Sequence, residues 1–128
     1  MKTLYVAVDT ETGGLNPNKN ALLTVGLAIA EYNANNFIEL NFKIKDDIDF
    51  YSVEEDALKI NKINLDDLVS KGLESRDVDC AIDAALENYE NDYNIVYVGQ
   101  NIKFDLSFLR TRLPILFDRI VSSRNVVE

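Results

Sequence analysis

The sequence predicts an α/β fold in which a mixed β-sheet is flanked by helices. Three strand-like segments come first, a group of helix-like segments follows, and a strand and a helix come last. The helical stretch between the third and fourth strands is long enough for a crossover, so strands can pair in parallel. With 128 residues, 47% of them apolar, the chain is expected to form one globular domain over residues 1–128.

Four segments have the residue pattern of strands. Residues Leu4 to Val8 are nearly all apolar β-formers, which predicts a central strand buried on both faces. Residues 21–32 and 36–45 are separated by a turn-rich tetrapeptide of asparagine and alanine, and together predict an antiparallel hairpin. Residues 94–99 predict a compact fourth strand.

Two short helices and one longer helix are predicted in the middle of the chain. The segment Ser52 to Glu55 fits a capping box that opens the first helix, and residues 64–69 predict a second helix that stops at Gly72. Ser75 is a plausible N-cap for the longer helix, in which we expect Cys80 to be a small buried thiol.

The end of the chain predicts one more helix and one more strand. Apolar spacing from Phe104 to Leu113 indicates a helix, which Pro114 should end. A fifth strand is expected around residues 119–127.

Charge and hydropathy limit the function classes. A net charge of -9 argues against broad electrostatic binding of duplex nucleic acid. Only residues 99–128 are locally cationic, and their basic residues are either ordinary solvated charges or a phosphate-facing surface beside Asp105. The basic residues of this segment are Lys103, Arg110, Arg112, Arg119 and Arg124.

The chain has no membrane-length apolar run and no signal-peptide pattern. We therefore expect no membrane partner and a cytoplasmic location.

Two carboxylates follow the first predicted strand. Asp9 and Glu11 are two residues apart, so they project from the same face if the strand continues to Glu11. Neighbouring carboxylates favour either protonation of one or capture of a hard divalent cation. Mg²⁺ or Mn²⁺ is the expected choice, because the chain has no histidine and only one cysteine for zinc or copper.

A third carboxylate, Asp105, follows the fourth predicted strand. It lies in the first turn of the next helix, where an aspartate usually serves the helix dipole. Functional groups of α/β sheets gather beyond the carboxyl ends of parallel strands. We therefore expect Asp105 to meet Asp9 and Glu11 if the strands at residues 4–8 and 94–99 are parallel neighbours.

The joint pattern resembles a known family, the DEDD or DnaQ-like 3'-5' exonucleases. Residues 9–15 are similar to its first motif and residues 99–109 to its second, and their separation is similar to that of the family. Residues 53–63 resemble the helical segment between the motifs, so the resemblance covers nearly the whole chain. It implies an RNase H-like fold with strand order 3-2-1-4-5 and two-metal hydrolysis at the 3' ends of single-stranded DNA or RNA.

The resemblance also implies roles for individual residues. Asp9 would bridge two Mg²⁺ or Mn²⁺ ions, Glu11 would hold one of them, and Asp105 would act mainly through metal-bound water. Gly13, Gly14 and Leu15 would contact the terminal nucleotide. The substrate-binding set carried over in this way is Thr10, Thr12, Gly13, Gly14, Leu15, Asn101 and Phe104.

The sequence departs from the family pattern near its end. The family's third motif supplies a fourth aspartate and a histidine or tyrosine base, and this chain has neither that motif nor any histidine. Gln100 stands where many members have histidine. If the chain is complete we expect a weak or inactive enzyme, because losing the base costs roughly 10²- to 10⁴-fold.

Several alternatives remain open at this point. Glu128 is weighed as a substitute ligand at the end of the fifth strand, whereas Asp118 should lie at the far end of that strand. A second copy or another polypeptide is weighed as the source of the absent part. Beside a nuclease, the chain fits a catalytically inactive module that binds nucleic acid ends or a metal, or a protein-interaction subunit. No motif specifies DNA or RNA.

Overall fold

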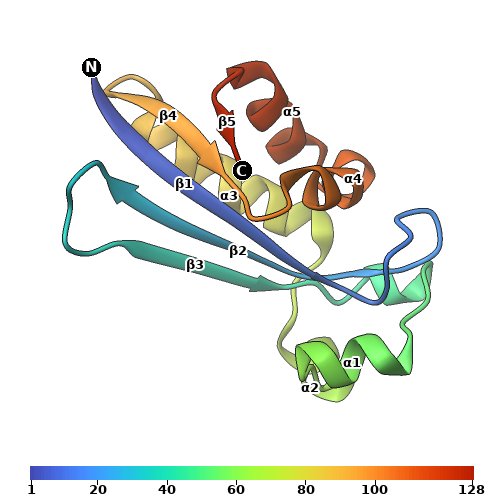
Figure 1. Ribbon diagram of the computed structural model, residues 1–128. Helices are drawn as coiled ribbons and strands as arrows, with labels where there is room; N and C mark the ends of the chain where they lie inside the picture. Colours follow the sequence, from blue (N-terminus) through green and yellow to red (C-terminus); the bar gives the residue numbers. More distant parts are fainter.

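Five strands form one mixed sheet in the order β3-β2-β1-β4-β5, as predicted (Figure 1). The computed structural model describes residues 1–128. The central strand β1 pairs antiparallel with β2 and parallel with β4, and β5 pairs parallel with β4. The strands are β1 (Lys2–Thr12), β2 (Leu22–Glu31), β3 (Ile38–Lys43), β4 (Tyr93–Val98) and β5 (Val126–Val127).

The helices lie between β3 and β4 and after β4. Their bounds are η1 (Asp47–Asp49), α1 (Glu55–Asn61), α2 (Leu65–Lys71), α3 (Ser75–Glu90), α4 (Ile102–Arg112) and α5 (Pro114–Ser123). The main core forms where α3, α4 and α5 pack on one face of the sheet (Figure 1). Helices α1 and α2 lie beyond the end of the sheet at which β1 and β3 finish, where Leu68 joins a smaller core with Ala21 and Leu23.

The opposite face of the sheet is open. In β1, Leu4, Val6 and Val8 are buried against the helices, whereas Tyr5 and Ala7 on the other face are exposed. The prediction that residues 4–8 are buried on both faces is therefore wrong. Because the three core helices all cover the same face, alternate residues of β1 remain in contact with solvent.

Both predicted serine caps are also wrong. Helix α1 begins after Glu54 without a side-chain cap, and the Ser52 hydroxyl donates to the Lys19 carbonyl at 3.1 Å. Ser75 is the first residue of α3 rather than its N-cap, and its amide and hydroxyl donate to the Asp46 carboxylate. Each serine bonds a partner distant in sequence, which a local capping pattern cannot reveal.

The end of the chain folds differently from the prediction. Pro114 ends α4, as expected, but it is also the first residue of a further helix, α5, where its missing N–H is not needed. Asp79 of α3 accepts hydrogen bonds from the Ile115 and Leu116 amides, both at 3.0 Å, and so caps α5 from outside. The fifth strand shrinks to two residues, and Asp118 lies on α5 instead of at the beginning of that strand.

Two smaller predictions concern Cys80 and membranes. Cys80 is exposed, contrary to expectation, because the buried stripe of α3 runs through Val78, Ile82 and Leu86 and leaves Cys80 on the solvent side. No helix in the structure is both long and apolar enough to cross a membrane. A cytoplasmic location stays a prediction.

Arg112, the last residue of α4, joins α4 to the segment that follows β1. Its side chain is only 4% exposed, and it donates to the Asp47 carboxylate at 3.2 Å and to the Pro17 and Asn20 carbonyls at 2.6 and 2.8 Å. The guanidinium also lies 3.5 Å from the centre of the Tyr51 ring. One buried cation thus fixes the loop between β1 and β2.

We expect Arg112→Met to lower the free energy of unfolding by about 3 to 5 kcal/mol, because it leaves the buried Asp47 carboxylate without its charged partner. Urea unfolding followed by circular dichroism measures this loss. The matched control is Arg110→Met on the same helix, where the side chain is exposed and forms no ion pair, and a change within about 0.5 kcal/mol is expected. Equal losses in the two variants would contradict the role given to Arg112.

Candidate active site

Strand β1 carries two carboxylates onto the open face of the sheet. It continues to Thr12, so Asp9 and Glu11 share one face, as predicted, while Thr10 and Thr12 point to the helix-covered face and are buried. Asp9 is exposed and Glu11 is half-buried. Neither carboxylate accepts a hydrogen bond from a neighbour, so both are free to turn toward an incoming group.

Asp105 reaches the same end of the sheet from α4. Since β1 and β4 are parallel and Ala7 pairs with Val98, the chain leaves β4 beside the carboxyl half of β1. Asp105 is 6% exposed, and its Oδ1 accepts a hydrogen bond from the Thr10 hydroxyl at 2.5 Å. Thr10 lies between Asp9 and Glu11 in the strand. The fold thus brings the Asp105 carboxylate, 95 residues after Thr10 in the sequence, next to this pair.

The three acids influence one another electrostatically. Burial raises the pKa of Glu11 above its ordinary value, and the charges of Asp9 and Asp105 raise it further. Burial also raises the pKa of Asp105; the hydrogen bond from Thr10 opposes this rise, and the charge of Asp9 adds to it. The site therefore concentrates negative charge that a cation would relieve.

The donor set fits a hard divalent cation, but the side chains are not arranged as a closed site. Carboxylate oxygens suit Mg²⁺ and Mn²⁺. As they stand, no three His, Cys, Asp or Glu side chains are placed to hold one ion together. One oxygen of Asp105 is engaged by Thr10, and the unrestrained Asp9 and Glu11 side chains would have to turn to share an ion.

Glu128 was weighed as a substitute for the absent fourth aspartate, and it follows β5, which pairs in parallel with the end of β4. It therefore lies at the sheet edge where β4 finishes, and its role as a ligand stays a prediction. Asp118 instead adds to the raised pKa of Asp79, which burial causes in the first place.

Close backbone approach explains the two glycines that follow β1. A Cβ on Gly13 would lie 2.7 Å from the Ser52 carbonyl oxygen, and one on Gly14 would collide with the side chains of Asn20 and Glu54. Backbone hydrogen bonds from Gly13 to Ala21 and from Glu54 to Gly13, both 2.7 Å, hold this approach. Any larger side chain would push the residue 52–54 segment away from the loop.

The remaining predicted substrate contacts divide into exposed and supporting residues. Leu15 is 82% exposed and available for contact. Asn101 is exposed at the start of α4, and Phe104 is half-buried with its ring 5.2 Å from that of Phe108. Thr12 donates to the Gly14 carbonyl at 2.6 Å, so, like Thr10, it is already engaged within the protein.

Sequence reasoning missed two residues that hold the site together. Asn61 of α1 donates to the Thr12 carbonyl at 3.0 Å and ties α1 to the end of β1. Arg112 was weighed only as a solvated or phosphate-facing charge, but it is internal. Asn61 lies in the segment 53–63 that resembles the family, but its contact was not predicted, and no local pattern marks Arg112 as internal. Both residues act on segments far away in the sequence.

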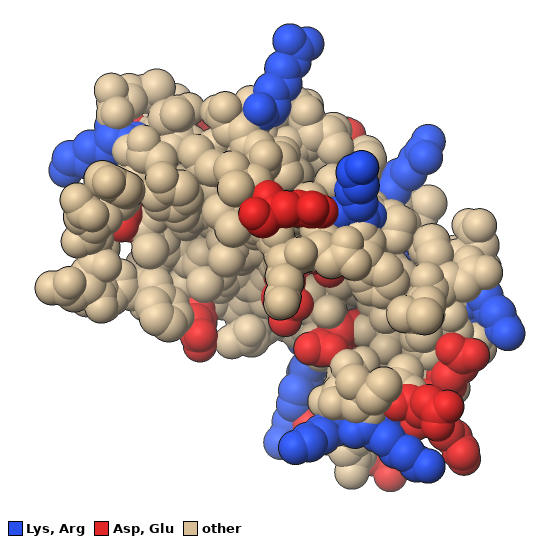
Figure 2. All heavy atoms as spheres, viewed as in Figure 1, with Lys and Arg blue, Asp and Glu red and all other residues tan.

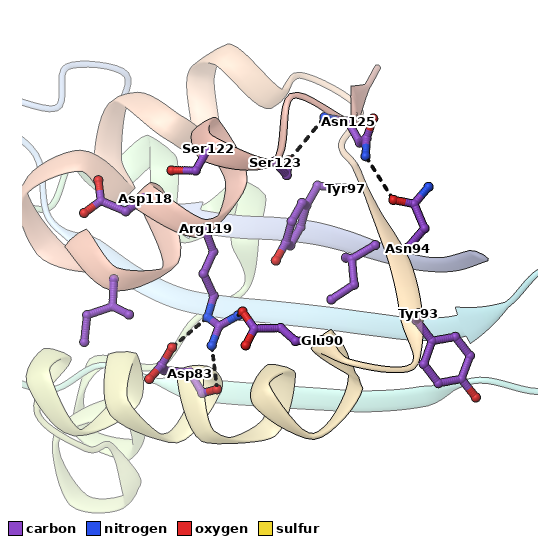
Figure 3. A pocket seen from close by; sticks show the side chains of 12 residues that line it. Asp83, Glu90, Tyr93, Asn94, Tyr97, Asp118, Arg119, Ser122, Ser123 and Asn125 are labelled. Carbon is purple, nitrogen blue, oxygen red and sulfur yellow. Dashed lines mark hydrogen bonds and ion pairs between the residues drawn. The ribbon is translucent and has the colours of Figure 1, made fainter. Parts of the chain in front are cut away.

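The cationic segment near the end of the chain contributes less free charge than its composition suggests. Arg112 is buried against Asp47, and Arg119 of α5 is held by Asp83 and Glu90 of α3 (Figure 3). The basic residues left without an ion pair in this segment are Lys103, Arg110 and Arg124.

We expect the metal-free protein to lose stability as the pH rises. The raised pKa values of Glu11 and Asp105 mean that the folded state holds protons more tightly than the unfolded chain. This contribution is complete below the ordinary values of 4.5 and 3.8 and disappears as the pH passes the raised folded values. Asp9→Asn removes a charge that raises both values, so its stability should fall less steeply.

Urea unfolding in EDTA at several pH values from about 4 to 8 measures this slope. Glu39→Gln is the control, because it removes an exposed charge elsewhere on the sheet. If Asp9→Asn and wild type show the same dependence on pH, the three acids do not share one electrostatic environment.

Comparison with known proteins adds to this geometry. A sequence profile of the 3'-5' exonuclease domain matches residues 1–126. The 3'-5' DNA exonuclease Cap18 of Escherichia coli is 28% identical over 109 residues, which cover 84% of this chain and 56% of Cap18. The chain thus spans about half the length of this relative.

Solved structures of exonuclease I share the fold. A product-bound form superimposes with a TM-score of 0.69 at 19% identity, over 86% of this chain and 25% of the other. A metal-free E. coli exonuclease I–ssDNA complex gives 0.66 at 20% identity, over 84% and 23% of the two chains. The architecture is therefore the RNase H-like fold of these exonucleases. Since the profile match extends over nearly all residues, the chain belongs to the DnaQ-like 3'-5' exonuclease superfamily.

Proposed function

We propose that residues 1–128 act as one exonuclease-like domain that removes nucleotides from the 3' end of a single strand with two Mg²⁺ or Mn²⁺ ions. The observation that carries this proposal is the hydrogen bond between Thr10 and Asp105, which places the third acid beside Asp9 and Glu11. Cap18 is named a DNA exonuclease and exonuclease I has been solved with single-stranded DNA. Single-stranded DNA is therefore the substrate to test first.

Each residue of the site has a separate role in this proposal. Asp9 and Glu11 would hold the ions on the open face, where a strand can approach without displacing a helix. Asp105 is kept in position by Thr10 and completes the acidic set. When bound, Mg²⁺ or Mn²⁺ would lower the pKa of the attacking water and stabilise the leaving oxygen. Gly13, Gly14 and the exposed Leu15 directly follow β1 and suit contact with the terminal nucleotide.

Two observations also favour a second candidate, a module that binds 3' ends without cutting them. The 128 residues contain no histidine, and no three acids are ready to hold one ion. A general base typically contributes 10²- to 10⁴-fold to the rate. Cleavage by this domain alone is therefore expected to be slow.

With Mn²⁺, the purified protein should shorten a 5'-labelled single strand of DNA from its 3' end, and denaturing gels should show a ladder of products. Asp9→Ala and Asp105→Ala should abolish the ladder, because each removes an acid of the set, whereas Glu39→Ala should retain it. Internal cuts, or cutting that survives Asp9→Ala, would refute the exonuclease proposal. Tight binding of the strand without any products would support the second candidate.

Calorimetric titration should show Mn²⁺ binding that releases protons, because metal coordination requires the acids of raised pKa to be ionised. Asp9→Asn should weaken this binding at least about tenfold. Glu39→Gln serves again as the control. Equal affinity in Asp9→Asn and wild type would place the bound ion elsewhere.

A further inference from the structure

A groove on the open face of the sheet has acids on one side and lysines on the other. This cavity of about 470 Å³ is bordered by Asp9 and Glu11 of β1 and by Lys43 of β3 and Lys71 of α2. Its volume lies within the range of small-ligand sites, about 300 to 1,000 Å³. Sequence reasoning gave no role to either lysine.

Strand register places the two sides at a defined separation. Glu11 pairs with Thr24, and Thr24 pairs with Lys43, so the three form one row across the sheet. Paired residues project from the same face, and two strand spacings amount to about 10 Å. The backbone of Lys43 therefore lies about 10 Å from that of Glu11, a separation comparable to the size of one nucleotide.

Gly26 forms part of the bottom of the groove and has no side chain to fill it. It lies between Asp9 and Asn41 in the next row of residues on the same face of the sheet. A Cβ on Gly26 would come within 2.9 Å of the Asn41 side-chain oxygen. The groove therefore continues uninterrupted from the acidic side to the basic side.

The lysines carry an unbalanced positive charge. Lys43 and Lys71 both pair with one carboxylate, Asp67, at 2.5 and 2.9 Å, and their side chains remain 43% and 70% exposed. Two ammonium groups against one carboxylate leave one charge in excess. Basic side chains indeed gather at the end of the molecule where α1 and α2 lie, with acidic ones next to them (Figure 2). Exposed ion pairs contribute at most about 1 kcal/mol, so stability alone does not account for the arrangement.

A larger cavity elsewhere in the molecule has no such excess of positive charge. It measures about 600 Å³ and lies between α3, α5 and β4 (Figure 3). Its one cation, Arg119, is already paired with Asp83 and Glu90, and Asp118 adds a further negative charge. A phosphate would be repelled there.

We propose that Lys43 and Lys71 bind a backbone phosphate of the single strand whose 3' end lies at Asp9, Glu11 and Asp105. This inference rests on the proposed function and extends it to the path of the substrate. In a strand cut at its last phosphodiester bond, every other phosphate lies on the 5' side of the cut. The lysine pair therefore receives a phosphate 5' to the scissile one, and this phosphate competes with the Asp67 carboxylate for the two ammonium groups. In a protein of net charge -9, such a local cation is needed to offset repulsion of the strand.

Fluorescence anisotropy with a 5'-labelled eight-nucleotide DNA strand tests this, with Ca²⁺ replacing Mg²⁺ to prevent cutting. Lys43→Gln with Lys71→Gln should weaken binding roughly tenfold at low salt. It should also reduce the slope of log affinity against log salt by about 0.7, the value for one phosphate contact with a single strand. The control is Lys2→Gln with Lys59→Gln, which removes the same charge from exposed lysines outside the groove that form no ion pair.

Asp67→Asn separates phosphate binding from a purely structural role. It breaks both ion pairs but leaves both lysines, so the proposal expects affinity to be kept or increased. If Asp67→Asn reproduces the loss, the lysines only hold α2 against β3 and the proposal is overturned. It is also overturned if the groove and control double variants lose the same affinity and slope. In both cases the proposed function stands, whereas a wild-type protein that binds no strand refutes the two together.

Discussion

The parallel pairing of β1 with β4, locked by the Thr10–Asp105 hydrogen bond, is the constraint on which the candidate site depends. The paired residues extend from Lys2 opposite Tyr93 to Ala7 opposite Val98, so both strands finish at the same edge of the sheet. A slip of β1 by one residue would turn Asp9 and Glu11 toward the helices and Thr10 toward solvent. The register therefore decides which face carries the acids and whether Asp105 has a partner.

The one-sided covering of the sheet follows from the same arrangement and suits the chemistry. Helices α3, α4 and α5 bury Asp105 and Thr10 on their face, while Asp9 and Glu11 remain accessible on the other. A buried acid stabilised by a hydroxyl thus stands beside exposed acids that can move. Such a site is more costly at neutral pH than an apolar edge would be, because the pKa values of Glu11 and Asp105 are raised. A bound cation would remove that cost.

Much of the fold could be predicted because it depends on local periodicity. The central strand, the hairpin and the parallel fourth strand all follow from apolar patterns, and the motif resemblance supplied the strand order. Pro114 shows where this fails: a proline marks both the end of one helix and the start of another, so α5 was missed and its residues 119–123 were predicted as part of a strand. The caps at Ser52 and Ser75 failed because Lys19 and Asp46 compete for their hydroxyls.

The candidate site was only partly predictable for similar reasons. The spacing of Asp9 and Glu11 determines their common face, and this needs only the strand. Three other features depend on contacts between distant segments. These are the hydrogen bond from Thr10 to Asp105, the burial of Arg112 and the position of Lys43 in one row with Glu11. The catalytic, metal-binding and substrate-binding roles of the site residues stay predictions.

An anomalous-difference map from a crystal soaked in Mn²⁺ tests most directly whether the three acids share a cation site. The account predicts a peak about 2.0 to 2.3 Å from an Asp9 carboxylate oxygen, with Glu11 as a second ligand and Asp105 at direct or water-bridged distance. A fully occupied peak elsewhere on the molecule, or no peak beside Asp9 at saturating Mn²⁺, would contradict it.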